Sequence, residues 1–172
     1  MRDALLLVDV VNDFEHEDGE WLLMSFRDRH DGFVTMLERA RCEGMPVVYA
    51  NDNFGVWDGD ATRLVRSALE GRGGELVEAI APREGGTFVV KPRYSAFDHT
   101  PLDIILAELG IERLLLGGMS TEGCVAQTTI DARELGFKVS VLADACASVD
   151  ERLERVALEY LESVAGARIE RG

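Results

Sequence analysis

The run Ala4-Leu5-Leu6-Leu7-Val8-Asp9-Val10 is apolar at every position except Asp9. A short, nearly continuous apolar run is typical of a strand that is buried on both faces, as in a parallel sheet covered by helices. Similar runs farther along the chain alternate with segments whose apolar residues recur at helical spacing. We expect further strands at 46–50, 87–90, 113–116, 138–142 and 167–170, and helices at 33–40, 61–69, 102–109, 121–135 and 153–164.

Strands that alternate with helices predict βαβ units with right-handed crossovers. We therefore expect an α/β fold, a three-layer α/β/α sandwich around a doubly wound, mostly parallel, Rossmann-like sheet of five to six strands. The length of 172 residues suits one domain, which we expect to span residues 1–172. In such folds a ligand binds beyond the carboxyl ends of the strands, at the point where the strand order reverses.

The charge balance restricts the class of partner. The chain has 18 basic and 32 acidic residues, a net charge of −14, which argues against binding to nucleic acid or to an anionic membrane. No apolar run approaches the ~20 residues of a membrane span, and no signal peptide is visible. Three cysteines, an odd number, suit a reducing compartment. We expect a cytoplasmic protein that acts on a small-molecule substrate.

Three polar residues stand at expected carboxyl ends of strands. Asp9 interrupts a buried run, where a carboxylate is costly unless it is paired. Lys91 precedes Pro92, which cannot continue a central strand. Cys124 follows the strand at 113–116, and if Thr121 caps the next helix, Cys124 lies in its first turn. Unpaired backbone N–H groups and the helix dipole favour a thiolate there.

Each of these residues also has a purely structural interpretation. A strand-end Asp often caps a turn, a strand-end Lys extends to water, and a buried Cys behaves as a small apolar residue. We expect the last role for Cys42 and Cys146. Taken together, however, Asp9, Lys91 and Cys124 would bring a carboxylate, an ammonium and a nucleophile into one crevice.

Three segments resemble the isochorismatase-like cysteine hydrolases, a superfamily that includes nicotinamidases and carbamoyl amidohydrolases. They are Leu6-Leu7-Val8-Asp9-Val10-Val11-Asn12-Asp13-Phe14, Val90-Lys91-Pro92-Arg93-Tyr94-Ser95-Ala96-Phe97 and Gly118-Met119-Ser120-Thr121-Glu122-Gly123-Cys124-Val125, with Asp144-Ala145-Cys146-Ala147 as a weaker fourth. The resemblance spans nearly the whole chain and implies a catalytic triad of Asp9, Lys91 and Cys124. It also implies a cis peptide between Met119 and Ser120, and an oxyanion hole formed by the backbone N–H groups of Ser120 and Cys124.

The members of this family differ in their chemistry. Isochorismatases lack the nucleophilic cysteine and cleave a vinyl ether, so Cys124 argues against that activity. Nicotinamidases carry an Asp-x-His and further histidines for a metal, whereas Asp52-Asn53-Phe54 offers only the carboxylate. We therefore expect no metal and no cofactor. The leading hypothesis is a metal-independent cysteine hydrolase that cleaves a C–N bond of an amide, ureido or carbamoyl substrate; the alternatives are a nicotinamidase-type amidase and a catalytically idle binding protein.

Side chains around the triad are the candidates for substrate binding. Phe14, Trp57, Tyr94 and Phe97 could form an aromatic wall, and Asn51 could make a polar contact; core packing is the alternative for each aromatic ring and is equally weighted for Phe97. Relatives commonly form dimers or tetramers, so we expect a homo-oligomer. The long connection at 53–74 is expected to be a lid over the active site, an interface between copies, or both.

Overall fold

A parallel sheet forms the centre of the molecule. The structure, a computed structural model, describes residues 1–83 and 86–171, and these form six strands in the order β3-β2-β1-β4-β5-β6, with every neighbouring pair parallel. The strands are β1 (Asp3–Val8), β2 (Val47–Asp52), β3 (Thr87–Lys91), β4 (Arg113–Met119), β5 (Lys138–Ala147) and β6 (Arg168–Glu170). The predicted doubly wound α/β fold is confirmed.

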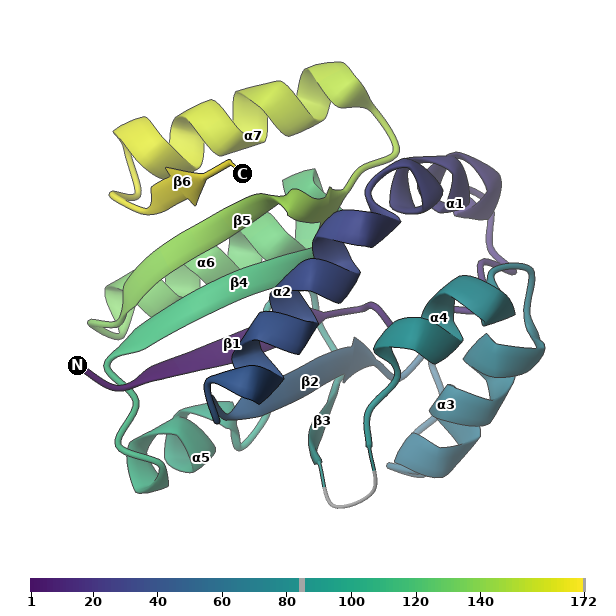
Figure 1. The fold of residues 1–172 in the computed structure, drawn as a ribbon, viewed down its shortest axis with the longest axis horizontal. Coiled ribbons are helices and arrows are strands. Elements are labelled where there is room, and N and C mark those ends of the chain that lie inside the picture. Colours follow the sequence, from purple (N-terminus) through teal and green to yellow (C-terminus); the bar gives the residue numbers. More distant parts are fainter. Residues whose placement is uncertain (84–85, 172) are drawn as a thin grey trace.

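Helices cover both faces of this sheet (Figure 1). They are α1 (Gly19–Asp28), α2 (His30–Cys42), α3 (Ala61–Glu70), α4 (Gly74–Ile80), α5 (Leu102–Glu108), α6 (Ala126–Glu134) and α7 (Glu151–Ser163), with a π-helical turn, η1 (Thr121–Val125), directly before α6. Side chains alternate along β1, so that Leu5 and Leu7 pack with α1–α4, whereas Leu6 and Val8 pack with α5–α7. The apolar run at the start of the chain therefore contributes to two cores.

The strand order reverses at β1. This strand pairs with β2 on one side and with β4 on the other, and Val8 lies opposite Gly118 in the β1–β4 register. Gly118 has φ +151, and a Cβ atom there would lie 2.2 Å from the carbonyl oxygen of Val8. Only glycine permits this approach, so β1 and β4 stay paired up to the edge where the predicted site lies.

Several elements differ from the sequence-based expectation. Helices α1 and α4 lie in segments for which the sequence predicted no helix. The patterns of these helices are weak: α1 exposes Trp21 and Met24 and buries only Gly19, Leu22 and Phe26. Strand β5 continues to Ala147 rather than ending at 142, and the helix expected at 121–135 begins with the π-helical turn η1.

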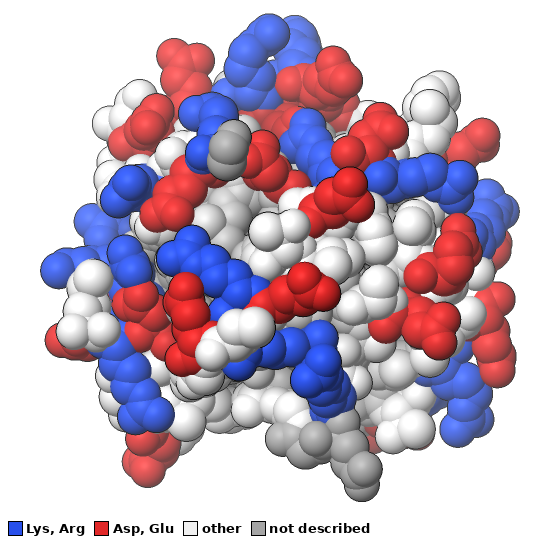
Figure 2. Space-filling view, viewed as in Figure 1, with Lys and Arg blue, Asp and Glu red and all other residues white. Residues whose placement is uncertain are grey.

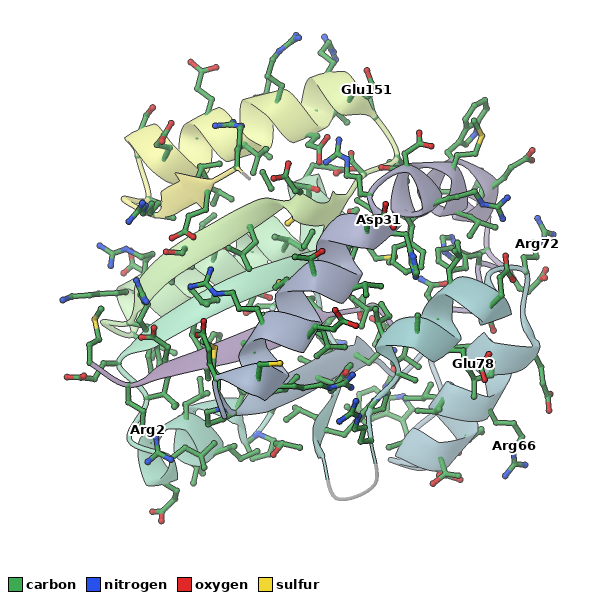
Figure 3. All side chains as sticks on the ribbon, in the orientation of Figure 1. Arg2, Asp31, Arg66, Arg72, Glu78 and Glu151 are labelled. Atoms are coloured by element: carbon green, nitrogen blue, oxygen red, sulfur yellow. The ribbon has the colours of Figure 1, made fainter. Side chains whose placement is uncertain are left out.

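The face formed by α1–α4 carries both signs of charge. Figure 2 shows Lys and Arg side chains interspersed with Asp and Glu on this face rather than one acidic field. Arg66, Arg72 and Glu78 of the α3–α4 region are exposed and point away from the sheet (Figure 3). No helix in the described part of the chain has the length and apolar character needed to cross a bilayer. Association between copies of the chain stays a prediction.

Candidate active site

Asp9 stands directly after β1, where the chain leaves the sheet. Its backbone has φ +54, in the left-handed region that Asp adopts more readily than most residues, and its N–H donates to Ala50 O at 2.9 Å. The side chain is almost completely buried. Oδ1 accepts the N–H of Asp52 at 2.7 Å, and Oδ2 lies 2.8 Å from Nζ of Lys91. Both carboxylate oxygens are thus fixed by the ends of β2 and β3.

Lys91 ends β3 and is fully buried, which is rare for lysine unless the ammonium is paired. Besides Asp9, its Nζ reaches Arg93 O at 3.0 Å and Cys124 Sγ at 3.4 Å, while Asp52 Oδ2 lies 3.8 Å away. Burial alone would lower the pKa of Lys91, but the negative charge of Asp9, with smaller contributions from Cys124 and Asp52, raises it. Lys91 therefore stays protonated and links the carboxylate to the thiol.

Cys124 lies in η1 and completes the cluster. Its sulfur lies 3.4 Å from Nζ of Lys91, the same ammonium that is paired with Asp9. Burial, followed by the negative charge of Asp9, raises the pKa of Cys124, and Lys91 only partly opposes this effect. We expected the helix N-terminus to favour a thiolate at Cys124, whereas burial and the charge of Asp9 favour the protonated thiol. In the resting site the thiol is protonated, and a base must remove its proton.

Asp9 can supply that base. Burial raises its pKa, although the charge of Lys91 and the hydrogen bonds from Cys124, Lys91 and Asp52 oppose the shift. A carboxylate with a raised pKa takes a proton more readily than an ordinary one. Because Asp9 and Cys124 both contact the ammonium of Lys91, at 2.8 and 3.4 Å, the arrangement can perform general-base activation of a nucleophile.

The backbone next to Cys124 turns sharply. The peptide bond between Met119 and Ser120 is cis, and the N–H groups of Gly123 and Val125 both donate to Ser120 O, at 3.2 and 3.1 Å. Thr121 does not cap this helix. Its hydroxyl lies instead 2.9 Å from Oε1 of Glu154, which belongs to α7. The oxyanion hole at Ser120 and Cys124 stays a prediction.

Phe14 and Asn51 do not face a substrate in this structure. The amide oxygen of Asn12 accepts the Phe14 N–H at 2.7 Å, and in this turn the Phe14 ring is fully buried, with its centroid 5.7 Å from that of Phe26. Asn51 is equally buried, and its amide bonds to the N–H and the C=O of Val11 at 3.0 and 2.9 Å. Both residues support the chain beyond β1 instead of lining a pocket, contrary to the expectation.

The other three candidates lie in different surroundings. Trp57 and Tyr94 are exposed, at 75% and 68% of their surface, so both rings are accessible to a ligand. Phe97 stacks on Phe137, with ring centroids 5.9 Å apart, and packs against the core under α5–α7. The core interpretation therefore holds for Phe97. The contact of Asp52 with Lys91 was not expected, and the place of Asp52 at the end of β2 is the signal that could have revealed it.

The donor atoms do not fit a metal of the nicotinamidase kind. Among residues 1–83 and 86–171, no three His, Cys, Asp or Glu side chains come together as a metal site requires. Asp52 is followed by Asn53, whose Oδ1 accepts the N–H of Gly55 at 2.9 Å. His99 is paired with Asp98, and His30 Nε2 lies 2.8 Å from Leu76 O. A lone carboxylate is a poor site for a transition metal.

Comparison with known proteins places this site in a family. The model of the isochorismatase domain matches residues 3–170. The uncharacterized isochorismatase family protein YaaI of Bacillus subtilis is 31% identical over 166 residues, which cover 96% of this chain and 92% of that protein. The crystal structure of nicotinamidase PncA from Bacillus subtilis superposes with a TM-score of 0.79 at 30% identity, covering 98% of this chain and 99% of that one. The crystal structure of N-carbamoylsarcosine amidase from Thermoplasma acidophilum superposes with a TM-score of 0.75 at 31% identity, covering 99% of this chain and 96% of that one. The chain therefore belongs to the isochorismatase family of hydrolases.

Proposed function

We propose that this chain is a metal-independent cysteine hydrolase that cleaves a C–N bond of a small amide, ureido or carbamoyl substrate through a covalent intermediate on Cys124. The chain is an amidohydrolase of its family, and one observation carries the finer proposal. A fully buried Lys91 lies 2.8 Å from Asp9 and 3.4 Å from Cys124, in a cluster that contains a nucleophile, a base and a fixed cation. This set is what acyl transfer to a thiol requires.

The first half of the reaction forms the covalent intermediate. Asp9 takes the proton from Cys124, and the Lys91 ammonium stabilises the resulting thiolate. The sulfur attacks the carbonyl carbon of the substrate, and the carbonyl electron pair moves onto oxygen, where the backbone N–H groups of Ser120 and Cys124 are proposed to receive it. Asp9 then gives its proton to the leaving nitrogen, the C–N bond breaks, and ammonia or an amine departs from the acylated Cys124.

The second half releases the acid. Water enters the position that the amine has left, Asp9 removes one of its protons, and the hydroxide oxygen attacks the thioester carbon. The C–S bond breaks, and the proton on Asp9 returns to the sulfur. General acid–base assistance of this kind contributes about 10²–10⁴-fold. The raised pKa of Asp9 suits both directions of proton transfer, because a carboxyl whose pKa is shifted towards neutral pH can both accept and release a proton there.

The solved structures that are similar to this chain suggest two types of substrate. Nicotinamidase acts on a carboxamide, and N-carbamoylsarcosine amidase, by its name, on a carbamoyl group attached to nitrogen. A nicotinamidase-type amidase is the second candidate, supported by the TM-score of 0.79 to that nicotinamidase. Asp52 also matches, in the sequence resemblance, the Asp of the nicotinamidases' Asp-x-His. The idle binding protein is disfavoured, because an ion pair as buried as Lys91–Asp9 would have no physical reason to persist in it.

An ammonia-release panel tests the proposal. Wild type would be assayed against nicotinamide, ureido acids, carbamoyl amines and simple amides, each with and without a chelator. We expect release from at least one carbamoyl or ureido compound, unaffected by chelation. Cys124→Ala should abolish release and leave the fold intact, whereas Cys42→Ala, at an exposed position on α2, should behave as wild type.

Each arm of the panel can contradict the proposal. Release that survives Cys124→Ala would remove the covalent step. Activity that is lost to a chelator and restored by one metal would favour the nicotinamidase-type alternative. An intact-mass measurement on the active wild type, quenched in acid during turnover, should show the added acyl group. Peptide mass spectrometry should then place it on the peptide that contains Cys124.

A further inference from the structure

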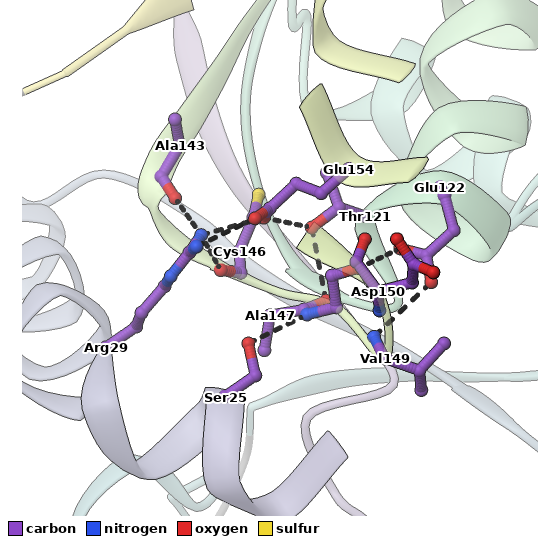
Figure 4. Close-up of polar contacts among 11 residues, drawn as sticks. Ser25, Arg29, Thr121, Glu122, Ala143, Cys146, Ala147, Val149, Asp150 and Glu154 are labelled. Carbon is purple, nitrogen blue, oxygen red and sulfur yellow. Dashed lines mark hydrogen bonds and ion pairs between the residues drawn. The ribbon is translucent and has the colours of Figure 1, made fainter. Parts of the chain in front are cut away.

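The turn that carries Cys124 is held by side chains that do not belong to the triad (Figure 4). The hydroxyl of Thr121 lies 2.9 Å from Glu154 Oε1 and 3.1 Å from Ala147 O. The carboxylate of Glu122 accepts the hydroxyl of Ser148 at 2.6 Å and the N–H of Val149 at 3.3 Å. Two residues close to Cys124 in sequence are thus attached to the end of β5, to the segment that follows it and to α7.

Glu154 is the centre of this network. It lies in the first turn of α7, is 5% exposed, and receives two bonds of 2.7 Å from the guanidinium of Arg29. Arg29 stands between α1 and α2, and its Nη1 also donates to Cys146 O at 2.9 Å. The carboxylate therefore ties the α1–α2 corner, the end of β5 and the start of α7 to the turn that carries Cys124.

Stability alone is a weak reason for this arrangement. A buried ion pair gains little over apolar side chains of the same volume, because both charges must leave water. A second arginine–carboxylate pair, between Arg113 and Asp3, joins β4 to β1 at the opposite end of these strands without a link to η1. What distinguishes Glu154 is the hydroxyl of Thr121, which connects it to the turn three residues before Cys124.

We propose that Glu154, held by Arg29, is a positioning residue that acts through the Thr121 hydroxyl to fix η1 so that Cys124 faces Asp9 and Lys91. Glu154 itself contacts neither the substrate nor the reacting atoms. The inference rests on the proposed function, since it assumes that the position of the Cys124 sulfur limits the rate. A displacement of about 1 Å at a reacting group can cost about 10²-fold in rate.

A double-mutant cycle tests the route through Thr121. Glu154→Gln, Thr121→Val and the double variant would be assayed on the best substrate from the ammonia-release panel. We expect each single change to lower kcat about 10- to 100-fold with little change in KM, and the double variant to be no worse than the poorer single one. Thr121→Ser, which keeps the hydroxyl, should stay close to wild type. The proposal would be overturned if the kcat losses of the two single variants multiplied in the double variant, or if the variants changed only KM.

Asp3→Asn is the matched control, because it removes the charge of a carboxylate paired with an arginine but leaves η1 untouched. It should change kcat little, whatever it does to thermal stability. Arg29→Lys keeps the charge and loses the two-bond geometry, so it should lower kcat in the same direction as Glu154→Gln. Circular dichroism would establish that each variant is folded. A kcat for Asp3→Asn as low as that of Glu154→Gln would contradict the positioning role, because it would mean that the Glu154 network affects turnover only through the stability of the fold.

Alkylation of Cys124 gives a readout that needs no substrate. Iodoacetamide labelling at one alkaline pH, followed by peptide mass spectrometry, should be slow in wild type because Cys124 is only partly exposed. Loosening η1 by Glu154→Gln should speed the labelling several-fold, whereas Asp3→Asn should not. Unchanged labelling in Glu154→Gln would contradict the positioning role. If the panel finds no substrate, the proposed function fails, but the labelling still decides this inference.

Discussion

The two ends of β1 each carry an aspartate paired with a basic residue of another strand, yet the pairs differ in their burial and in the cation that they use. At the amino end, Asp3 pairs with Arg113 of β4, and their side chains keep 19% and 28% of their exposure. At the carboxyl end, Asp9 pairs with Lys91 of β3, and the side chains keep 8% and 0%. The pair at the carboxyl end is the one that includes a third group, the thiol of Cys124.

The choice of cation explains much of this difference. Arginine cannot lose its proton in proteins and acts as a fixed fork, whereas lysine is a compact charge with three donors that can point in different directions. The three closest acceptors of Lys91 Nζ are Asp9, Arg93 O and Cys124. At the amino end, Arg113 Nε and Asp3 Oδ1 are buried without a hydrogen-bond partner in the described residues. The Asp9–Lys91 pair is therefore the one to which we assign a role in the reaction, and the Asp3–Arg113 pair joins two strands.

Turnover should show the largest contrast between the two ends. Asp9→Asn removes the base and should lower kcat about 10²–10⁴-fold, while Asp3→Asn should leave kcat within a small factor of wild type. Ammonia release from the best substrate measures both. Comparable losses at the two positions would mean that Asp9 supports the fold rather than the reaction.

The second-largest contrast between the two ends of β1 should be in the free energy of unfolding. Lys91→Met leaves the Asp9 carboxylate buried without its counter-ion, and loss of one partner of a buried pair costs about 3–5 kcal/mol. Arg113→Met affects a pair that water still reaches, so we expect a loss of about 1 kcal/mol. Urea denaturation at neutral pH, followed by circular dichroism, gives both free energies of unfolding. An equal or larger loss for Arg113→Met would reverse the comparison.

The smallest effect concerns the pH at which Cys124 reacts. Because burial and the charge of Asp9 raise its pKa above the ordinary value of 9.0, alkylation of Cys124 should be slow at neutral and acidic pH and should rise only in strongly alkaline solution. Asp9→Asn removes one cause of the shift, so its labelling should begin at lower pH, whereas Asp3→Asn should follow wild type. Labelling of wild-type Cys124 at mildly acidic pH would show instead that the thiol is ionised at rest.

The sequence predicted the framework of the site better than its lining. The apolar run around Asp9 and the Lys91-Pro92 break both reflect burial and backbone geometry, which local sequence expresses directly. The burial of Phe14 depends on a turn made by Asn12 and on packing against Phe26. The side-chain amide of Asn51, in β2, is hydrogen-bonded to the backbone of Val11, in the segment that follows β1. The contacts of Phe14 with Phe26 and of Asn51 with Val11 join separate segments and leave no periodic pattern.

The state of Cys124 was missed for a related reason. The position of a thiol in the first turn after a strand favours a thiolate on local grounds. Burial and the charge of Asp9 come from the whole fold, and they raise the pKa of the thiol. Thr121 likewise would cap the helix if only its neighbours mattered, but Glu154, from α7, accepts its hydroxyl instead.

The exposure of the tryptophans has a practical consequence for spectroscopy. The chain contains two tryptophans, and both Trp21 and Trp57 keep more than half of their surface in water, at 63% and 75%. Their fluorescence emission should change little when the core opens, because the indole rings already lie in a polar environment. Intrinsic fluorescence is therefore a poor reporter of unfolding for this molecule, but a ligand that covers Trp57 would shift its emission.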